Sequence, residues 1–320
     1  EQPAHLDNQP LNELEEQLAR GEQPDANPVD VILAFLNNEV YVVSSDALEG
    51  PDSQVDAKVS YMQRRLEGID SSETGAVFDR RQIVEDARVA VGGWVTPGES
   101  NKLTVRMSGA LYRDQFLSDQ RGSTALDSTS TNVERMTEAT VQYDHALGED
   151  AKAGSHFLSF GVDGLAQDLT SDRLGTGKAN RQRIAGFVQD LWSVGDSDEG
   201  VQFQLSPGAR FDADTQFGSA FTPRLAGSLS GGALTFRIGG GTGFRAPDFR
   251  ELYLRFENPG VGYIVQGAED LLPERSLSAN TGLDWAKDDV SLSVAGFFNH
   301  VRNLIQVGTD DIEPGALQVF

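Results

Sequence analysis

Histidines are the residues in this sequence best suited to metal binding or acid–base chemistry. The chain has four, His5, His145, His156 and His300, and it has no cysteine. The four lie far apart and match no spacing of zinc ligands. A metal site is therefore not expected, and isolated histidines on polar faces are the simpler interpretation.

Carboxylate pairs and a glycine run are the other groups whose spacing could do chemistry. The pairs are Asp196 with Asp198 and Asp212 with Asp214, and the run is 239–243. Neither pair continues into the glycine and distal glutamate of a calcium loop, so both read as turn residues. Pro247 follows the run too closely for a helix whose N-terminus could bind phosphate. We assign no catalytic residue and expect no metal and no cofactor.

The segment 244–275 is the best candidate for binding, because long ordered loops in compact domains are usually functional. It is rich in aromatic residues and arginines, which could hold an anionic metal chelate by stacking and charge. The candidate ligand-binding residues are Phe244, Arg245, Tyr253, Arg255 and Tyr263. An equally acceptable interpretation is that these side chains pack the loop onto the body of the protein.

Residues with this chemistry need a scaffold, and the composition limits what it can be. The chain of 320 residues has 26 basic and 49 acidic residues and a formal charge of −23. Nucleic acid is not expected as a partner because phosphate binding needs a basic face. No apolar run is long enough for a transmembrane helix, but a β-barrel crosses a membrane with alternating strands that never show one.

From residue 56 onward the hydrophobic period is two, as expected for strands. In 201–212, the odd-numbered residues from Val201 to Phe211 are mostly apolar and the even-numbered ones mostly polar or small. The pattern predicts about eleven strands, most of about ten to fifteen residues, longer than the strands of soluble sheets and suited to a tilted membrane span.

The predicted connections alternate in length, as they do in an outer-membrane barrel with periplasmic turns at one end and extracellular loops at the other. The short ones are 96–101, 148–154, 195–200, 230–233 and 286–289, and the longer ones are 118–131, 169–180, 213–220, 244–275 and 303–315. Four aromatic residues lie shortly before short turns, which predicts a girdle at one membrane interface. They are Trp94, Tyr143, Trp192 and Trp285.

Residues 1–55 differ from the rest. Residues 1–50 carry eleven acidic residues and one arginine. Helical spacing predicts one helix through Leu11 and Leu18 and a second through Val29 and Leu36, followed by a short strand at 40–43. We therefore predict a small acidic α/β segment at 1–55 joined to a β-barrel portion at 56–320.

Residues 234–283 contain GTGFRAP, ELY and LPE in that order, and FVQDLW, GARFD and TPRLA precede them. FNHVRNLI follows at 298–305. Together these motifs resemble the barrel of TonB-dependent outer-membrane receptors. The resemblance covers 56–320 and implies about eleven of the family's roughly 22 strands. It implies a mainly β fold, a partial antiparallel transmembrane barrel, in a fragment that lacks the plug and the final strands.

The resemblance also implies a function. The parent protein is expected to lie in the Gram-negative outer membrane, in contact with its lipid. There it would bind an extracellular metal chelate such as a ferric siderophore, or cobalamin, and import it when TonB pulls on a plug outside this chain. Residues 248–271 hold no histidine, which counts against haem.

Residues 5–50 more weakly resemble the start of SseB-family proteins, which are small soluble α/β proteins. That resemblance keeps an alternative open, in which the chain is a chimeric fusion that acts as a soluble or surface β-sheet interaction protein without transport activity.

Overall fold

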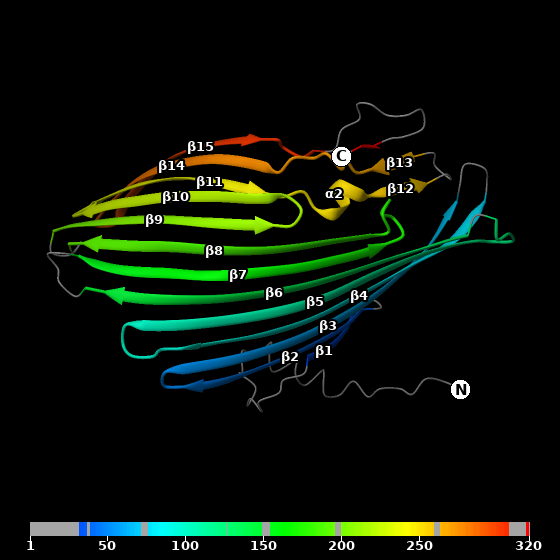
Figure 1. The fold of residues 1–320 in the computed structure, drawn as a ribbon, viewed down its shortest axis with the longest axis horizontal. Helices are drawn as coiled ribbons and strands as arrows, with labels where there is room; N and C mark the ends of the chain where they lie inside the picture. Colours follow the sequence, from blue (N-terminus) through cyan, green and yellow to red (C-terminus); the bar gives the residue numbers. More distant parts are fainter. Residues whose placement is uncertain are drawn as a thin grey trace.

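The computed structural model describes residues 32–36, 39–71, 76–125, 127–148, 154–195, 200–258, 263–306 and 318–319. Within them, thirteen strands form one antiparallel sheet in which each strand pairs with its neighbours in the order β1 to β11, β14, β15 (Figure 1). The strands are β1 (Ile32–Leu36), β2 (Glu39–Gly50), β3 (Ser53–Ser71), β4 (Val77–Val95), β5 (Asn101–Gln120), β6 (Ser128–Leu147), β7 (Ser155–Ser171), β8 (Lys178–Val194), β9 (Val201–Asp214), β10 (Gly218–Gly231), β11 (Leu234–Arg245), β14 (Glu274–Lys287) and β15 (Val290–Arg302).

A small second unit lies between β11 and β14. It holds the short helix α2 (Phe249–Tyr253) and the strands β12 (Arg255–Asn258) and β13 (Tyr263–Gln266), and β16 (Gln318–Val319) pairs with β13. No helix in the described ranges is long and apolar enough to cross a membrane.

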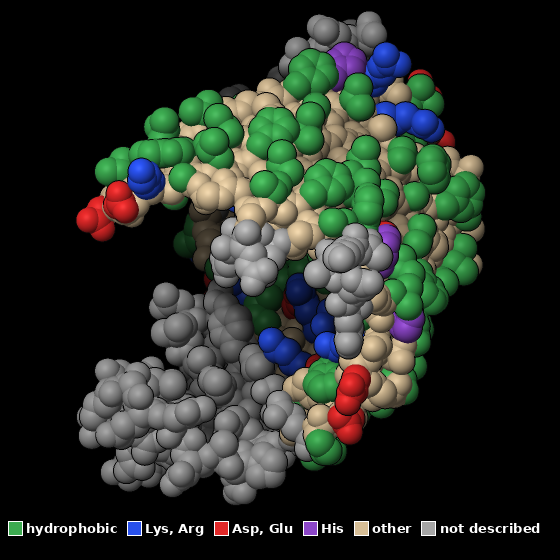
Figure 2. Space-filling model, turned by 90° about the vertical axis from the view of Figure 1, so that its left-hand side faces the viewer, with side chains coloured by type: hydrophobic (Ala, Val, Ile, Leu, Met, Phe, Trp, Pro, Cys, Tyr) green, Lys and Arg blue, Asp and Glu red, His purple; other side chains and the backbone are tan. Residues whose placement is uncertain are grey.

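The two faces of the main sheet have opposite chemistry. Residues directly opposite each other in an antiparallel pair share a face. Val162 pairs with Val141 on the outer face, and Asp163 pairs with Thr140 on the inner face. Outward apolar side chains are exposed, among them Val162 at 51% and Ile184 at 60%. Figure 2 shows these hydrophobic side chains spread over the convex surface, with Lys and Arg side chains inside the hollow.

An apolar outer face and a polar inner face are the arrangement of a barrel wall between lipid and a watery lumen. We call the inner face the lumen face. The eleven strands predicted from residue 56 onward correspond to β3–β11, β14 and β15. The alternation predicted for 201–212 is confirmed, since Phe203 and Phe211 point outward and are exposed.

The predicted alternation of loop length is wrong at three of the longer connections. The connections after β5, β7 and β9 span only 121–127, 172–177 and 215–217, and β3–β6 are 19 or 20 residues long. These strands extend beyond the apolar belt, where outward residues change from Leu111 to Arg113 on β5. With both faces polar there, the period of two disappears from the sequence although the backbone ladder continues.

The N-terminal prediction is partly wrong. Residues 32–36 form β1, a strand paired with β2, where the sequence predicts a helix. Branched Ile32 and the run of apolar residues after it suit either element, and pairing with β2 satisfies the backbone of both strands. The strand predicted at 40–43 lies within β2, and β2 pairs with β3 across the expected seam. The helix predicted through Leu11 lies outside the described residues, and the division at residue 55 stays a prediction.

Candidate functional site

Arg245 ends β11 and links three elements. Its Nε donates to Glu274 on β14 at 2.9 Å, and its terminal nitrogens donate to Glu251 on α2 at 3.1 Å. The Arg245 guanidinium, helped by the Ile305 backbone N–H, lowers the pKa of Glu274 to about 2. The same hydrogen bonds raise the pKa of Arg245. Arg245 is therefore already engaged as a clamp that ties α2 to the rim of the sheet.

The helix α2 is closed at its N-terminus by a capping box. The Asp248 side chain accepts from the backbone N–H groups of Arg250 and Glu251, and Glu251 accepts from the backbone N–H of Asp248. Such caps satisfy amides that a short helix would otherwise leave unpaired. Glu251 thus serves both the cap and the Arg245 clamp.

Tyr253 packs against the connection between β7 and β8. Its ring lies on a buried cluster formed by Leu169, Leu174, Ala179 and Phe249, and its hydroxyl accepts from Gln216 Nε2 at 3.1 Å. We call the segment 246–273 the rim strap, and its described residues are thereby folded onto the sheet. For Arg245 and Tyr253 this geometry favours the packing interpretation over direct ligand contact.

The other three candidates in this segment lie at other positions in the fold. Phe244 precedes Arg245 on β11, so strand alternation directs the two side chains to opposite faces. Arg255 begins β12, and its backbone N–H donates to the Arg173 carbonyl at 2.6 Å. Tyr263 begins β13, opposite Asn258. The role of all five residues as ligand contacts stays a prediction.

A basic and aromatic group on the lumen face was missed by the sequence reasoning. The guanidinium carbons of Arg80 and Arg173 lie 5.8 and 5.7 Å from the ring centre of Phe116. Arg64 and Arg250 lie within electrostatic range of the Tyr112 hydroxyl, as do the carboxylates of Asp86 and Asp114. We call these six residues the mouth cluster: Arg64, Arg80, Tyr112, Phe116, Arg173 and Arg250.

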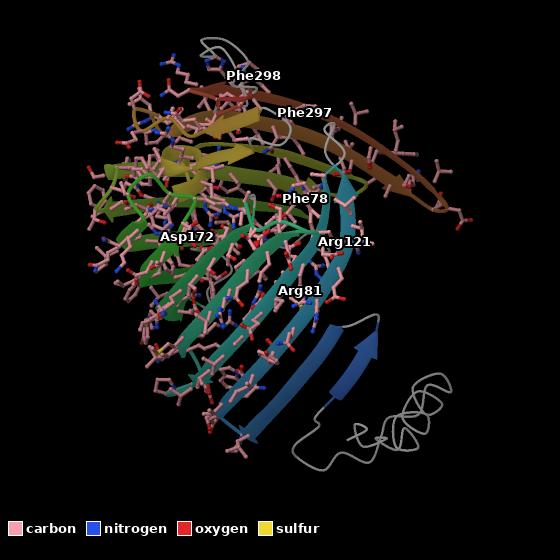
Figure 3. All side chains as sticks on the ribbon, turned by 90° about the vertical axis from the view of Figure 1, so that its right-hand side faces the viewer. Phe78, Arg81, Arg121, Asp172, Phe297 and Phe298 are labelled. Carbon is pink, nitrogen blue, oxygen red and sulfur yellow. The ribbon has the colours of Figure 1, made fainter. Side chains whose placement is uncertain are left out.

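The mouth cluster lies at the end of the sheet that carries the rim strap, opposite the short turns. Figure 3 looks at this end, where Asp172 marks the connection that holds Arg173. Arg173 Nε donates to Ser130 Oγ at 3.0 Å, which holds it over Phe116. The alternation of side chains along β3 and β4 could have assigned Arg64 and Arg80 to the lumen face. Nothing in the sequence places Arg173 and Arg250 beside them.

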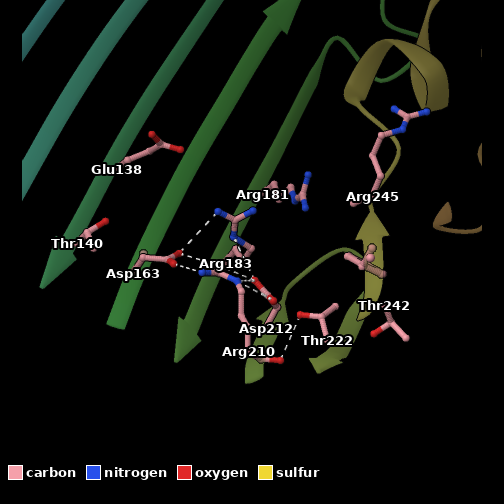
Figure 4. A pocket seen from close by; sticks show the side chains of 14 residues that line it. Glu138, Thr140, Asp163, Arg181, Arg183, Arg210, Asp212, Thr222, Thr242 and Arg245 are labelled. Atoms are coloured by element: carbon pink, nitrogen blue, oxygen red, sulfur yellow. Dashed lines mark hydrogen bonds and ion pairs between the residues drawn. The ribbon is translucent and has the colours of Figure 1, made fainter. Parts of the chain in front are cut away.

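A cavity of about 660 Å³ lies beside Arg245 on the lumen face (Figure 4). Arg210 forms ion pairs with Asp163 and, at 2.9 Å, with Asp212, while Arg183 lies 3.7 Å from both carboxylates. Each of these four charged side chains therefore lies near an opposite charge, which compensates the cost of removing it from water. Chemically this wall can hold polar groups of another segment or solute.

The predicted aromatic girdle is corrected at one position. Tyr143, Trp192 and Trp285 share the outer face with Phe160, Leu205 and Leu234, their partners in the ladder. Trp94 is opposite Thr104, and Thr104 is opposite Gln142, which places all three on the lumen face.

The Trp94 side chain is instead held on the lumen face of the sheet. Its Nε1 donates to Gln54 at 2.8 Å, and Lys102 Nζ lies 4.7 Å from the centre of its ring. The physical reason is register, because Trp94 is out of phase with outward Val91 and Val95.

The described ranges contain no group of three His, Asp or Glu residues that could hold a metal ion.

Comparisons with known proteins agree with this architecture. Residues 44–318 match the family model described as TonB dependent receptor-like, beta-barrel. The iron-regulated outer membrane virulence protein of Vibrio cholerae serotype O1 is 35% identical in an alignment of 162 residues that covers 48% of this chain and 24% of that protein. The chain thus matches about a quarter of the length of this relative.

Two solved structures share the fold at 13% identity. The hemophore receptor HasR of Serratia marcescens has a TM-score of 0.58 over 91% of this chain and 55% of its own. The ferric enterobactin receptor PfeA of Pseudomonas aeruginosa has a TM-score of 0.57 over 89% of this chain and 52% of its own. The apolar outer face and the family match argue against the soluble alternative. The chain belongs to the TonB-dependent receptor family, whose β-barrels lie in the Gram-negative outer membrane.

Proposed function

We propose that the full-length protein imports an anionic ferric siderophore across the outer membrane and that the mouth cluster makes the first contact with it. The observation that carries this proposal is the pair of guanidinium groups, Arg80 and Arg173, whose carbons lie 5.8 and 5.7 Å from the centre of the Phe116 ring. Guanidinium groups bind anionic oxygens with charge-assisted hydrogen bonds, and aromatic rings stack on planar chelating groups. The names of the V. cholerae relative and of the enterobactin receptor support iron as the cargo.

Transport would also need parts of the full-length protein other than the barrel residues that match the family model. In this proposal a plug within the barrel binds the chelate from below, and TonB supplies the force that releases it. The ion-paired wall around Arg210 would then face the plug, since its charges are compensated and its cavity is polar.

The test uses the full-length protein and ferric enterobactin as the probe. Replacing both arginines, Arg80→Gln with Arg173→Gln, removes two positive charges and keeps polar side chains that can still donate hydrogen bonds. We expect the Kd to rise about tenfold to a hundredfold, because a hydrogen bond to a charged group contributes about 1.5–3 kcal/mol. Tryptophan fluorescence quenching measures it. The control is Arg121→Gln, whose partner Asp79 lies on the outer face.

An unchanged Kd in the double variant would remove the mouth cluster from the ligand site. Haem is a second candidate cargo, but the three histidines in the described ranges, His145, His156 and His300, all project from the outer face. No described histidine can therefore ligate haem in the lumen. Hemin that binds more tightly than ferric enterobactin would reverse this preference.

A further inference from the structure

Two histidines lie side by side on the outer face, near the short turns. His145 on β6 is opposite Leu158, and His156 on β7 is opposite Leu147. They are therefore diagonal neighbours, about 7–8 Å apart along the sheet. Trp192 and Asp190 on β8 flank His156, and Tyr143 flanks His145. We call this group the outer box: Tyr143, His145, His156, Asp190 and Trp192.

The hydrogen bonds of the two imidazoles fix which nitrogen carries hydrogen. His145 Nδ1 lies 2.6 Å from Asn101 Oδ1, and His156 Nδ1 lies 2.8 Å from Asp190 Oδ2. Both oxygens can only accept, so each Nδ1 must donate. In the neutral ring the remaining nitrogen, Nε2, is then an acceptor. Two neutral rings held in this way offer two acceptors and no donor to their surroundings.

Asp190 adds negative charge on the lipid-facing side of the sheet. Its partner in the ladder is Leu158, and its side chain is only 21% exposed. Oδ1 is buried and accepts no hydrogen bond from the described part of the chain. Lys102 and Asp144, the nearest charged residues on β5 and β6, are opposite each other on the lumen face. A carboxylate in this setting favours a cation beside it.

Aromatic rings complete the outer box. The His156 ring stacks on Trp192 with centroids 5.9 Å apart and an interplanar angle of 4°. Tyr143 stacks on His145 at 6.3 Å, and Phe203 meets Trp192 edge-on at 5.8 Å. Electron-rich ring faces attract ammonium groups. Carboxylate, imidazole acceptors and rings together match a primary ammonium and do not match a phosphate.

A shallow apolar groove of about 380 Å³ begins next to the outer box. Its outward side chains are Phe160, Val162, Val188, Phe211 and Phe221, and Gly186 leaves space between them. Such a groove accommodates an acyl chain. Because short turns face the periplasm in these barrels, the box lies at the level of headgroups in the inner leaflet.

We propose that the outer box binds the primary ammonium of an ethanolamine phospholipid in the periplasmic leaflet, with one acyl chain in the adjacent groove. This site is separate from the lumen and does not depend on the cargo. It makes one prediction about headgroups, since a trimethylated ammonium keeps its charge but has no N–H to donate to Asp190 and the imidazoles.

The test is native mass spectrometry of the full-length protein in detergent with phosphatidylethanolamine, phosphatidylcholine and phosphatidylglycerol of identical acyl chains. At pH 7.5 we expect retention of the ethanolamine lipid about tenfold above either other lipid. Asp190→Asn and His156→Phe should abolish the preference. The control His300→Phe, which alters an outward histidine at the other end of the barrel, should keep it.

Equal retention of all three lipids at pH 7.5, or a preference for phosphatidylglycerol, would overturn the proposal. So would a preference that persists in a folded Asp190→Asn variant, with folding checked by heat-modifiable migration on gels.

Discussion

Replacing Arg245 with methionine tests whether the rim strap depends on the clamp. The change keeps a long side chain and removes the ion pairs to Glu251 and Glu274. Arg245 is 46% exposed and the two carboxylates are 17% and 15% exposed, so solvent screens both pairs. Partly exposed pairs contribute about 0.2–1 kcal/mol each, and the weakened cap adds a similar amount. We expect the strap to lose about 1–2 kcal/mol of local stability.

Hydrogen exchange measures this loss at the amides that hold the strap. Leu252 donates to the Asp248 carbonyl, Leu254 to Arg250, and Ala268 to Glu251 at 2.9 Å. Their protection should fall roughly fivefold to thirtyfold, while amides within β11 keep theirs. The control is Arg275→Met, because Arg275 is opposite Phe244 and points away from the clamp. A change under about twofold in the strap, or an equal loss in β11, would refute the reasoning.

The low pKa of Glu274 gives the same prediction a pH dependence. A carboxyl group whose pKa is lowered by folding adds stability above its ordinary value of 4.5 and loses it as pH falls toward about 2. Strap protection in the wild type should therefore exceed that of Glu274→Gln at pH 6, and the difference should shrink between pH 4.5 and 2. A difference that is constant across this range would show that Arg245 does not act through charge.

Two further substitutions test the strap and the lipid face. Gly267→Ala should destabilise the strap by about 1–3 kcal/mol, since a Cβ there would lie 2.7 Å from the Glu251 carbonyl oxygen, whereas Gly175→Ala meets nothing within 4 Å. Hydrogen exchange at Ala268 distinguishes them, and equal protection would contradict this close approach. Val188→Arg, at a lipid-facing position that is 52% exposed, should cost about 2–4 kcal/mol in denaturant titrations in lipid vesicles. Gln204→Arg on the lumen face should cost less than about 1 kcal/mol, and a reversed order would mean that the faces are assigned wrongly.

The barrel wall could be predicted from the sequence because lipid imposes a rule on every second residue. Outward positions such as Phe203, Phe211 and Leu283 must be apolar, and the period of two is visible wherever the lumen side is polar. The same rule shows that Trp94 does not belong to the aromatic girdle on the outer face. Val91 and Val95 mark the outward phase, and Trp94 lies between them, whereas Trp192 is in phase with Ile184 and Val188.

The mouth cluster could not be predicted in this way. Polar residues fill the lumen face of every strand, so the pattern does not single out Arg64 or Arg80 from the rest. Phe116 is on a third strand, and Arg173 is in a connection whose position depends on its bond to Ser130. Only the register of the sheet and the path of the loops bring these residues together, and neither can be read from a single sequence.

The motif that carried the family resemblance describes the strap rather than the ligand. In GTGFRAP, Arg245 forms the clamp and Pro247 is fully buried. In ELY, Glu251 caps α2 and Leu252 is 2% exposed. In LPE, Glu274 forms an ion pair with Arg245. Side chains bound this closely to their own fold are poorly placed to select a ligand. The motif therefore identifies the barrel, and selectivity should follow from residues outside it, beginning with Arg80 and Arg173.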